Sequence, residues 1–140
     1  MFARLLVPVD LAEPAVAQPA IDAAVKLASD HGGALRFINV QSVVPLAFTE
    51  YVPADFDKQQ GNRAEVAIAE IASNCGLPAH RVTSVVRFGG VYPEVLAEAE
   101  ACGADLIVVG SHRPAMSTYL LGSNATTIVR HAVCSVLVVR

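Results

Sequence analysis

A polar segment late in the chain contains most of the residues that could bind an anion. Gly110 ends an apolar run, and Gly122, Ser123 and Asn124 begin a stretch with helical spacing. The first N–H groups of a helix lack internal partners and carry the positive end of its dipole, so this spacing favours a phosphate site. Ser123 and Asn124 can donate to phosphate oxygens, and Arg113 can add a charged two-pronged donor. Alternatively, the glycines serve turns, and Ser123 or Asn124 only caps the helix.

Two further candidates lie where other apolar segments end. Asp10 follows Val7-Pro8-Val9, where its carboxylate can reach a ligand or cap the next turn. Val40 ends the second apolar segment, where its backbone can lie against a base. The chain has no G-x-x-x-x-G-K-[ST] loop, and no G-x-G-x-x-G follows the first apolar segment, which excludes a P-loop NTPase and argues against a dinucleotide site. No nucleophile-elbow pentapeptide is present either.

These candidates must be positioned by alternating strands and helices. Continuous apolar runs such as Leu106-Ile107-Val108-Val109 are typical of strands covered on both faces, as in a parallel sheet. The expected strands are Arg4–Val9, Ala34–Val40, Val82–Arg87, Asp105–Gly110 and Ser135–Val139. Apolar residues at helical spacing predict helices over Pro14–His31, about Asp55 to Cys75, Val91–Cys102 and about Gly122 to His131.

This alternation predicts one α/β domain over residues 1–140, with a doubly wound five-stranded parallel sheet and helices on both faces. The common strand order is 3-2-1-4-5, and ligands bind where strands 1 and 4 diverge. That rule selects the carboxyl ends of Arg4–Val9 and Asp105–Gly110 independently of any motif. The long loop Gln41–Ala54 follows strand 2 on the same side, and we expect either a functional loop or a hydrophobic lid or packing flap.

Composition narrows the function classes. The chain has 140 residues, 54% of them apolar and 16% charged, which argues against disorder. Its net charge of −3 argues against broad nucleic-acid binding, and no apolar run approaches the roughly 20 residues of a membrane span. No export signal is visible, so we expect a cytoplasmic protein. The odd count of three cysteines at wide spacing fits neither a disulfide framework nor a zinc site, and we expect them to pack as small apolar residues.

Three segments together resemble the universal stress proteins: Val7-Pro8-Val9-Asp10, the loop from Gly110 to Gly122-Ser123, and the ending from Cys134 to Arg140. The resemblance covers the whole chain and is strongest to the small bacterial F- and G-type members over Ser111 to Ala125. Nucleotide-binding members carry G-x2-G-x9-G-[ST] after strand 4. Here Arg113 replaces the second glycine, and the span from it to Gly122 is one residue shorter. Arg113 would either clamp the phosphates or obstruct their path.

The resemblance implies an adenine nucleotide alpha-hydrolase-like fold that binds ATP, or AMP or ADP, with or without Mg²⁺. Asp10 would contact the ribose and Val40 the adenine edge. The remaining implied contacts to the nucleotide are Pro8, Val9, Val109, Gly110, Ser111, Arg113, Gly122, Ser123 and Asn124. The family also implies a homodimer through the C-terminal strand, with a tetramer as a larger assembly.

Three functions remain open. The first is an ATP-binding regulatory protein of the stress response without catalytic residues, in which any hydrolysis is slow. The second is a nucleotide-independent dimeric interaction module that uses the apolar terminal strand Ser135–Val139. The third is an adenylating or ATP-hydrolysing enzyme of the same fold. It is disfavoured because Val9-Asp10-Leu11-Ala12 stands where such enzymes have a Ser-Gly-Gly loop. We expect neither a nucleic-acid nor a membrane partner.

Overall fold

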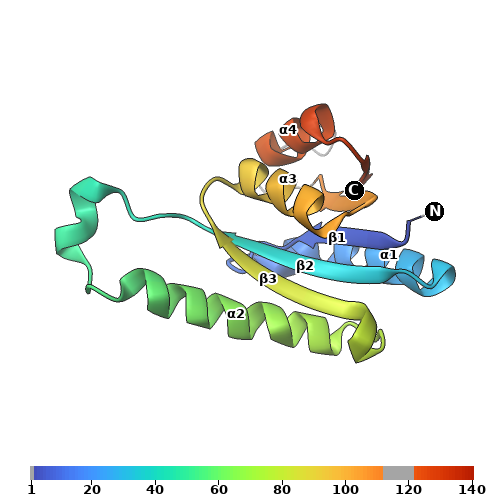
Figure 1. Cartoon of the computed structure of the whole chain (residues 1–140), viewed down its shortest axis with the longest axis horizontal. Coiled ribbons are helices and arrows are strands. Elements are labelled where there is room, and N and C mark those ends of the chain that lie inside the picture. The colour runs from blue at the N-terminus through green and yellow to red at the C-terminus, as the bar shows by residue number, and fades with distance from the viewer. Residues whose placement is uncertain (1, 112–121) are drawn as a thin grey trace.

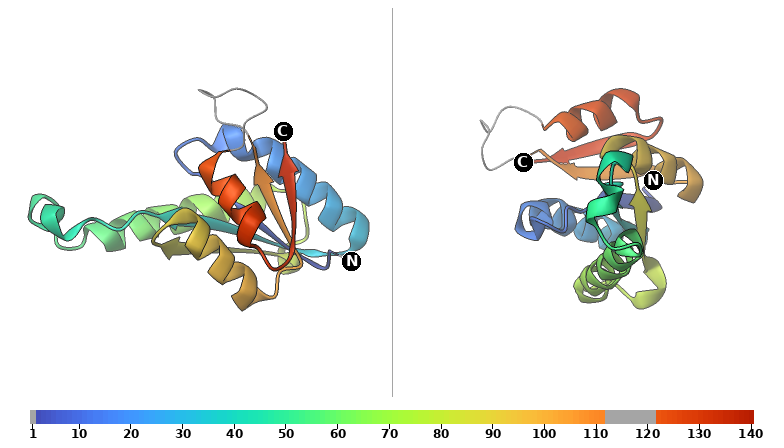
Figure 2. Two further views of the ribbon diagram at one scale, coloured as in Figure 1. Left: turned by 90° about the horizontal axis from the view of Figure 1, so that it is seen from above. Right: turned by 90° about the vertical axis from the view of Figure 1, so that its left-hand side faces the viewer.

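The computed structural model describes residues 2–111 and 122–140, which form a parallel sheet between two layers of helices (Figures 1 and 2). The sheet has five strands in the order β3-β2-β1-β4-β5, as predicted. The strands are β1 (Arg4–Pro8), β2 (Ala34–Gln41), β3 (Val82–Phe88), β4 (Leu106–Gly110) and β5 (Ser135–Val139). The helices are α1 (Pro14–His31), α2 (Phe56–Asn74), α3 (Val91–Cys102) and α4 (Ser123–His131). The predicted alternation is therefore confirmed.

The sheet separates two apolar cores. Leu5 and Val7 of β1 pack with α1 and α2 on one face, whereas Leu6 packs with α3 and α4 on the other. All three side chains are at most 1% exposed, because β1 is the central strand and is covered on both faces. This explains why its sequence is a continuous apolar run and not an alternating one.

β1 and its neighbour β4 stay paired over a short distance only. β1 pairs with β2 from Arg4↔Ala34 to Pro8↔Ile38, but with β4 only at Leu5↔Leu106 and Leu6↔Ile107. Beyond that point β4 continues alongside β5. A crevice therefore opens at the carboxyl ends of β1 and β4, which is the predicted switch point.

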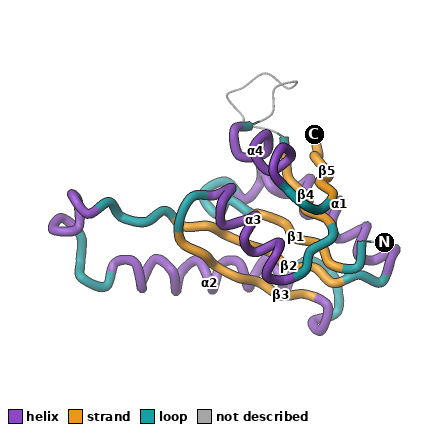
Figure 3. Tube along the Cα trace, turned by 45° about the horizontal axis from the view of Figure 1, so that its top comes forward, coloured by secondary structure: helices purple, strands orange, loops and turns teal. Residues whose placement is uncertain are grey.

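The segment between β2 and α2, which we call the arm (residues 42–55), extends away from the sheet (Figures 1 and 3). It contains a short 3₁₀ helix over Leu46–Tyr51. The side chains of Leu46 and Tyr51 are 90% and 75% exposed. The arm is therefore not a packing flap, because its apolar side chains do not contact the core. A second 3₁₀ turn, Ala79–Arg81, precedes β3.

The three cysteines are free thiols, and two of them pack against a core. Cys75 packs against the core on the α1 and α2 side, and Cys134 against the core on the α3 and α4 side. Burial raises the pKa of the Cys134 thiol. Among the helices of residues 2–111 and 122–140, none is both long enough and apolar enough to cross a bilayer.

A charged cluster attaches α3 to the sheet. The Glu98 side chain of α3 is almost fully buried and forms ion pairs with Arg36 of β2 and Arg87 of β3. The Arg87 Nη1 to Glu98 Oε2 distance is 2.8 Å, and the Arg87 Nε to Glu94 Oε1 distance is 3.5 Å. The hydrogen bond to Glu98 raises the pKa of Arg87 further above its usual value. The carboxylate of Glu98 thus compensates two guanidinium groups at once.

Replacing Glu98 by alanine should leave both guanidinium groups without this partner. We expect Glu98→Ala to lower the free energy of unfolding by about 1.5–3 kcal/mol, because it removes charge-assisted hydrogen bonds to two partly exposed guanidinium groups. Urea unfolding followed by circular dichroism measures the effect. Asp30→Ala is the control, because it removes the exposed Lys26–Asp30 pair, which contributes under about 1 kcal/mol. Equal losses in the two variants would contradict the prediction.

Candidate functional site

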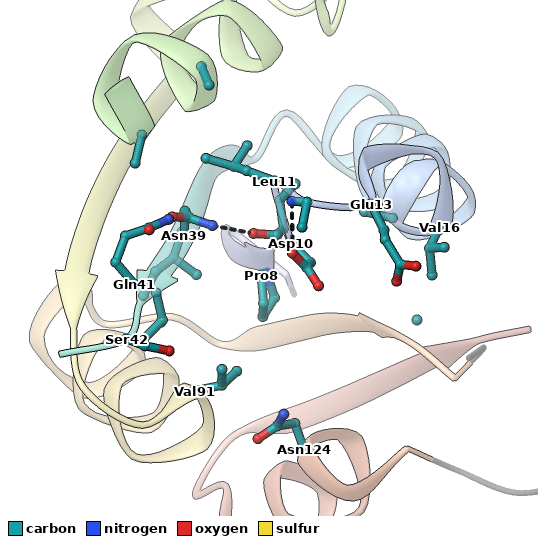
Figure 4. A pocket seen from close by; sticks show the side chains of 18 of the residues that line it. Pro8, Asp10, Leu11, Glu13, Val16, Asn39, Gln41, Ser42, Val91 and Asn124 are labelled. Carbon is teal, nitrogen blue, oxygen red and sulfur yellow. Dashed lines mark hydrogen bonds between the residues drawn. The ribbon is translucent and has the colours of Figure 1, made fainter. Parts of the chain in front are cut away.

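A cavity of about 1020 Å³ lies at the carboxyl ends of the strands, where β1 and β4 diverge (Figure 4). Nine of the residues expected to contact a ligand line it: Pro8, Val9, Asp10, Val40, Val109, Gly110, Ser111, Gly122 and Asn124. Ser123 is exposed at the start of α4 and is not among the lining residues. Arg113 lies outside the described residues. The topology thus brings most of the expected residues to one cavity.

The first turn of α4 borders this cavity and is not capped by a side chain of the described residues. Gly122 is the N-cap, so neither Ser123 nor Asn124 serves as the cap that the sequence left open as an alternative. The backbone bond from Thr126 N–H to Gly122 C=O, 3.0 Å long, begins the helix ladder. The N–H groups before Thr126 carry the positive end of the dipole, and the Asn124 side chain extends from this turn toward the cavity (Figure 4).

Gly110 lies in regular β4 backbone beside the cavity. It pairs with Val139, and the Ser111 N–H continues the ladder by donating to the Val139 C=O over 2.9 Å. A Cβ built on Gly110 would lie 3.7 Å from the Val16 carbonyl oxygen, an ordinary contact. Its φ is not positive, so neither a sharp turn nor crowding by the described residues requires glycine here. The absent side chain leaves room on the α1 side of the cavity, near the Val16 carbonyl oxygen.

Asp10 stabilises the turn after β1 and still faces the cavity. Its Oδ1 accepts a hydrogen bond from the Ala12 N–H over 2.9 Å, and the Glu13 N–H donates to its C=O over 3.2 Å (Figure 4). The side chain is exposed. Within the described residues, Oδ2 has no hydrogen-bond partner. The turn-capping role therefore leaves one carboxylate oxygen for a ligand.

Val40 presents an open backbone edge to the cavity. In β2 the even-numbered residues face β1: the Ala34 N–H donates to Ala3 C=O, and Ile38 C=O accepts from Val9 N–H over 2.8 Å. Val40 has the same orientation, but the β1–β2 register ends at Pro8↔Ile38. Among the described residues, no backbone group pairs with the Val40 N–H or C=O on this edge. One donor and one acceptor therefore lie side by side at the cavity wall.

Three amide side chains of the wall were missed by the sequence reasoning. Asn39 is only 3% exposed and donates from Nδ2 to the Val9 C=O over 2.9 Å (Figure 4). Gln41 Nε2 donates to Asn39 Oδ1, and Gln60 Nε2 of α2 donates to Gln41 Oε1 over 2.7 Å. Polar residues at alternate positions of an otherwise buried strand were the available signal.

The charges at the cavity are few. Asp10 and Glu13 lie on the β1–α1 side, and Arg63 belongs to α2; all three are exposed. In the part of the chain that the structure describes, Arg63 is in no ion pair, and no three His, Cys, Asp or Glu side chains gather as a metal site. The cavity wall itself therefore consists mainly of backbone, amide and apolar groups.

Comparisons with known proteins identify the family. The sequence model of the universal stress protein family matches residues 1–140. The chain is 37% identical to Universal stress protein G of Shigella flexneri, with all of both chains covered. It is 30% identical to Universal stress protein A homolog 1 of Coxiella burnetii, covering 99% of this chain and 96% of the relative.

Solved structures share the fold at lower identity. Universal stress protein UspA of Lactobacillus plantarum is 23% identical, with a TM-score of 0.80 over 99% of this chain and 98% of that one. A universal stress protein in complex with cAMP has 20% identity and a TM-score of 0.64, covering 99% of this chain and 97% of that one. The Archaeoglobus fulgidus protein in complex with dAMP has 15% identity and a TM-score of 0.61, covering 99% and 98%. The fold is the adenine nucleotide alpha-hydrolase-like one, and the chain belongs to the universal stress protein family.

Proposed function

We propose that this protein binds an adenine nucleotide, ATP or its mono- or diphosphate, and acts as a regulatory protein of the stress response. The observation that carries the proposal is that one cavity has groups suited to a base on one side and groups suited to an anion on the other. Among the residues that the structure describes, a backbone edge without a partner lies on its β2 side and a helix N-terminus without a side-chain cap on its α4 side. Two solved relatives of the same fold hold cAMP and dAMP, which supports this ligand class.

The β2 side suits the base. Adenine presents an acceptor, N1, beside a donor, the 6-amino group, and the Val40 N–H and C=O are complementary to this pair. Val9 and Val109 supply apolar surface in the same cavity. Asp10 Oδ2 lies at the next strand end, where a ribose hydroxyl can donate to it. We therefore assign the base and the ribose to the ends of β2 and β1.

The α4 side suits the phosphates. The N–H groups of the first turn, which no side chain of the described residues caps, and the Asn124 side chain favour a bound anion. The Ser123 hydroxyl at the rim and the Arg113 guanidinium are proposed to assist, with Arg113 acting as a clamp. Mg²⁺ would enter with the polyphosphate, because no described side-chain cluster is built for a metal. We assign no catalytic residue, so the proposed role is binding and not turnover.

Calorimetric titration tests the proposal directly. Purified protein should bind ATP and AMP saturably, and adenosine more weakly, since adenosine lacks the groups that would contact α4. GTP, whose N1–H and O6 reverse the donor and acceptor of the adenine edge, should bind more weakly than ATP. Correctly folded protein that binds no adenine nucleotide at millimolar concentration would show that the proposal is wrong.

Gly110→Ala tests ligand binding separately from the stability of the fold. Because a Cβ fits here without strain, we expect the free energy of unfolding to stay the same or rise by up to about 1 kcal/mol. The methyl group would enter the cavity on its α1 side, beside the Val16 carbonyl oxygen, and take space from the nucleotide, so the affinity for ATP should fall by roughly tenfold or more, about 1.4 kcal/mol. Gly32→Ala is the matched control: its φ of +68° favours glycine and it lies far from the cavity. That variant should lose stability and keep ATP affinity; the opposite pattern would argue against the assignment.

The second proposed property is homodimerisation through β5. This strand forms one edge of the sheet, and two nearby apolar side chains, Val133 and Leu137, are 83% and 36% exposed. An unpaired apolar edge favours pairing with another strand, and a second copy can pair with it symmetrically. This property also supports the alternative function, an interaction module that needs no nucleotide.

A lysine on the edge should prevent this pairing. We expect wild-type protein to be a dimer by light scattering and Leu137→Lys to be a folded monomer, because a charged edge residue disfavours strand addition. Val66→Lys is the control, since Val66 is an exposed apolar residue of α2, away from β5. A monomeric wild type, or a Leu137→Lys variant that dimerises like the wild type, would contradict the interface.

A further inference from the structure

The open edge of Val40 depends on a side chain that replaces the backbone. In a parallel ladder, the bond after Val9 N–H to Ile38 C=O is Val40 N–H to Val9 C=O. Here the Val9 C=O accepts instead from Asn39 Nδ2 over 2.9 Å. We propose that Asn39 is a positioning residue that occupies the Val9 carbonyl and so keeps the Val40 N–H available for the nucleotide base. This inference rests on the proposed nucleotide function.

The chemistry of the carbonyl fixes the orientation of Asn39. The Val9 C=O can only accept, so the amide nitrogen of Asn39 must face it and the amide oxygen must face away. That oxygen accepts from Gln41, and the Gln41 oxygen accepts from Gln60. The orientation of each amide in this row is therefore determined by its hydrogen bond to the preceding one. Asn39 is only 3% exposed, yet both polar atoms of its side chain have hydrogen-bond partners.

The row of amides also explains why Asn39 does not swing into the cavity. Gln60 lies on α2 and Gln41 on β2, so the row connects the strand end to a helix packed on the same face of the sheet. The final acceptor, Gln60 Oε1, is buried without a partner among the described residues. Gln41 and Gln60 thus fix Asn39, and Asn39 fixes the Val9 carbonyl.

An apolar residue at position 39 should reverse this arrangement. Without the amide donor, the Val9 C=O would be a buried acceptor, and the nearest backbone donor in register is the Val40 N–H. Formation of that bond would extend the β1–β2 ladder by one position and remove the donor from the cavity wall. The protein would remain folded but lose part of its base site.

Amide hydrogen exchange measured by NMR tests the inference without relying on ligand binding. In wild-type protein the Val40 N–H should exchange much faster than the Ile38 N–H, and AMP should slow it. In Asn39→Leu the Val40 N–H should be protected without ligand, and the AMP affinity should fall roughly tenfold, the equivalent of about one hydrogen bond. Asn39→His offers a ring N–H at the same reach and should restore fast exchange and affinity; a purely steric role would not be rescued in this way.

The outcomes separate the two proposals. Asn39→Leu that is folded, with Val40 exchange and AMP affinity as in wild type, overturns the role of Asn39. If that variant does not fold, Asn39→Asp replaces it, because an aspartate has the same size but its carboxylate cannot donate. Wild-type AMP affinity in Asn39→Asp would also overturn the role of Asn39. A Val40 N–H already protected in the wild type overturns the inference without any variant. Wild-type protein that binds no nucleotide refutes the proposed function, while the exchange comparison still decides whether Asn39 controls the Val40 edge.

Discussion

β1 and β4 are hydrogen-bonded neighbours at only two register positions, Leu5↔Leu106 and Leu6↔Ile107, before their carboxyl ends separate. The separation follows from the topology, because the chain crosses to opposite faces of the sheet on either side of this pair. The cavity, the open edge of β2 and the start of α4 all lie around that gap. Had the two strands remained paired to Gly110, the cavity would be closed by backbone.

Hydrogen-bond donors, acceptors and a helix dipole lie at fixed positions around this gap. Val40 contributes a donor and an acceptor, Asp10 contributes carboxylate oxygen, and the first turn of α4 contributes positive dipole. Each comes from a strand end or a helix start whose position is set by buried apolar residues of both cores. A ligand with a base at one end and phosphates at the other matches this order, which is why the proposed site needs no charged core.

The fold and most of the cavity lining could be predicted from the sequence, because both depend on patterns along single segments. Continuous apolar runs predicted covered strands, and glycines with polar residues at strand ends predicted the lining at Gly110 and Gly122. The amide row of Asn39, Gln41 and Gln60 was not found, because its members lie on different elements and its meaning depends on a missing ladder bond. The arm was expected on the ligand side, and its two ends line the cavity at Ser42 and Pro53, but nothing in its composition predicts that its middle extends into solvent.

Glu98 and Gly110 illustrate two different reasons for a residue to be where it is. Glu98 is required by its surroundings, because it lies buried between the guanidinium groups of Arg36 and Arg87. Gly110 is not required by residues 2–111 and 122–140: the backbone there is ordinary, and an added Cβ meets none of their atoms closer than 3.7 Å. A residue that the fold does not require, at the wall of a cavity, is best explained by what enters the cavity. Asn39 combines both kinds of role, since the hydrogen bond that satisfies its buried amide is also the one that leaves the Val40 edge open.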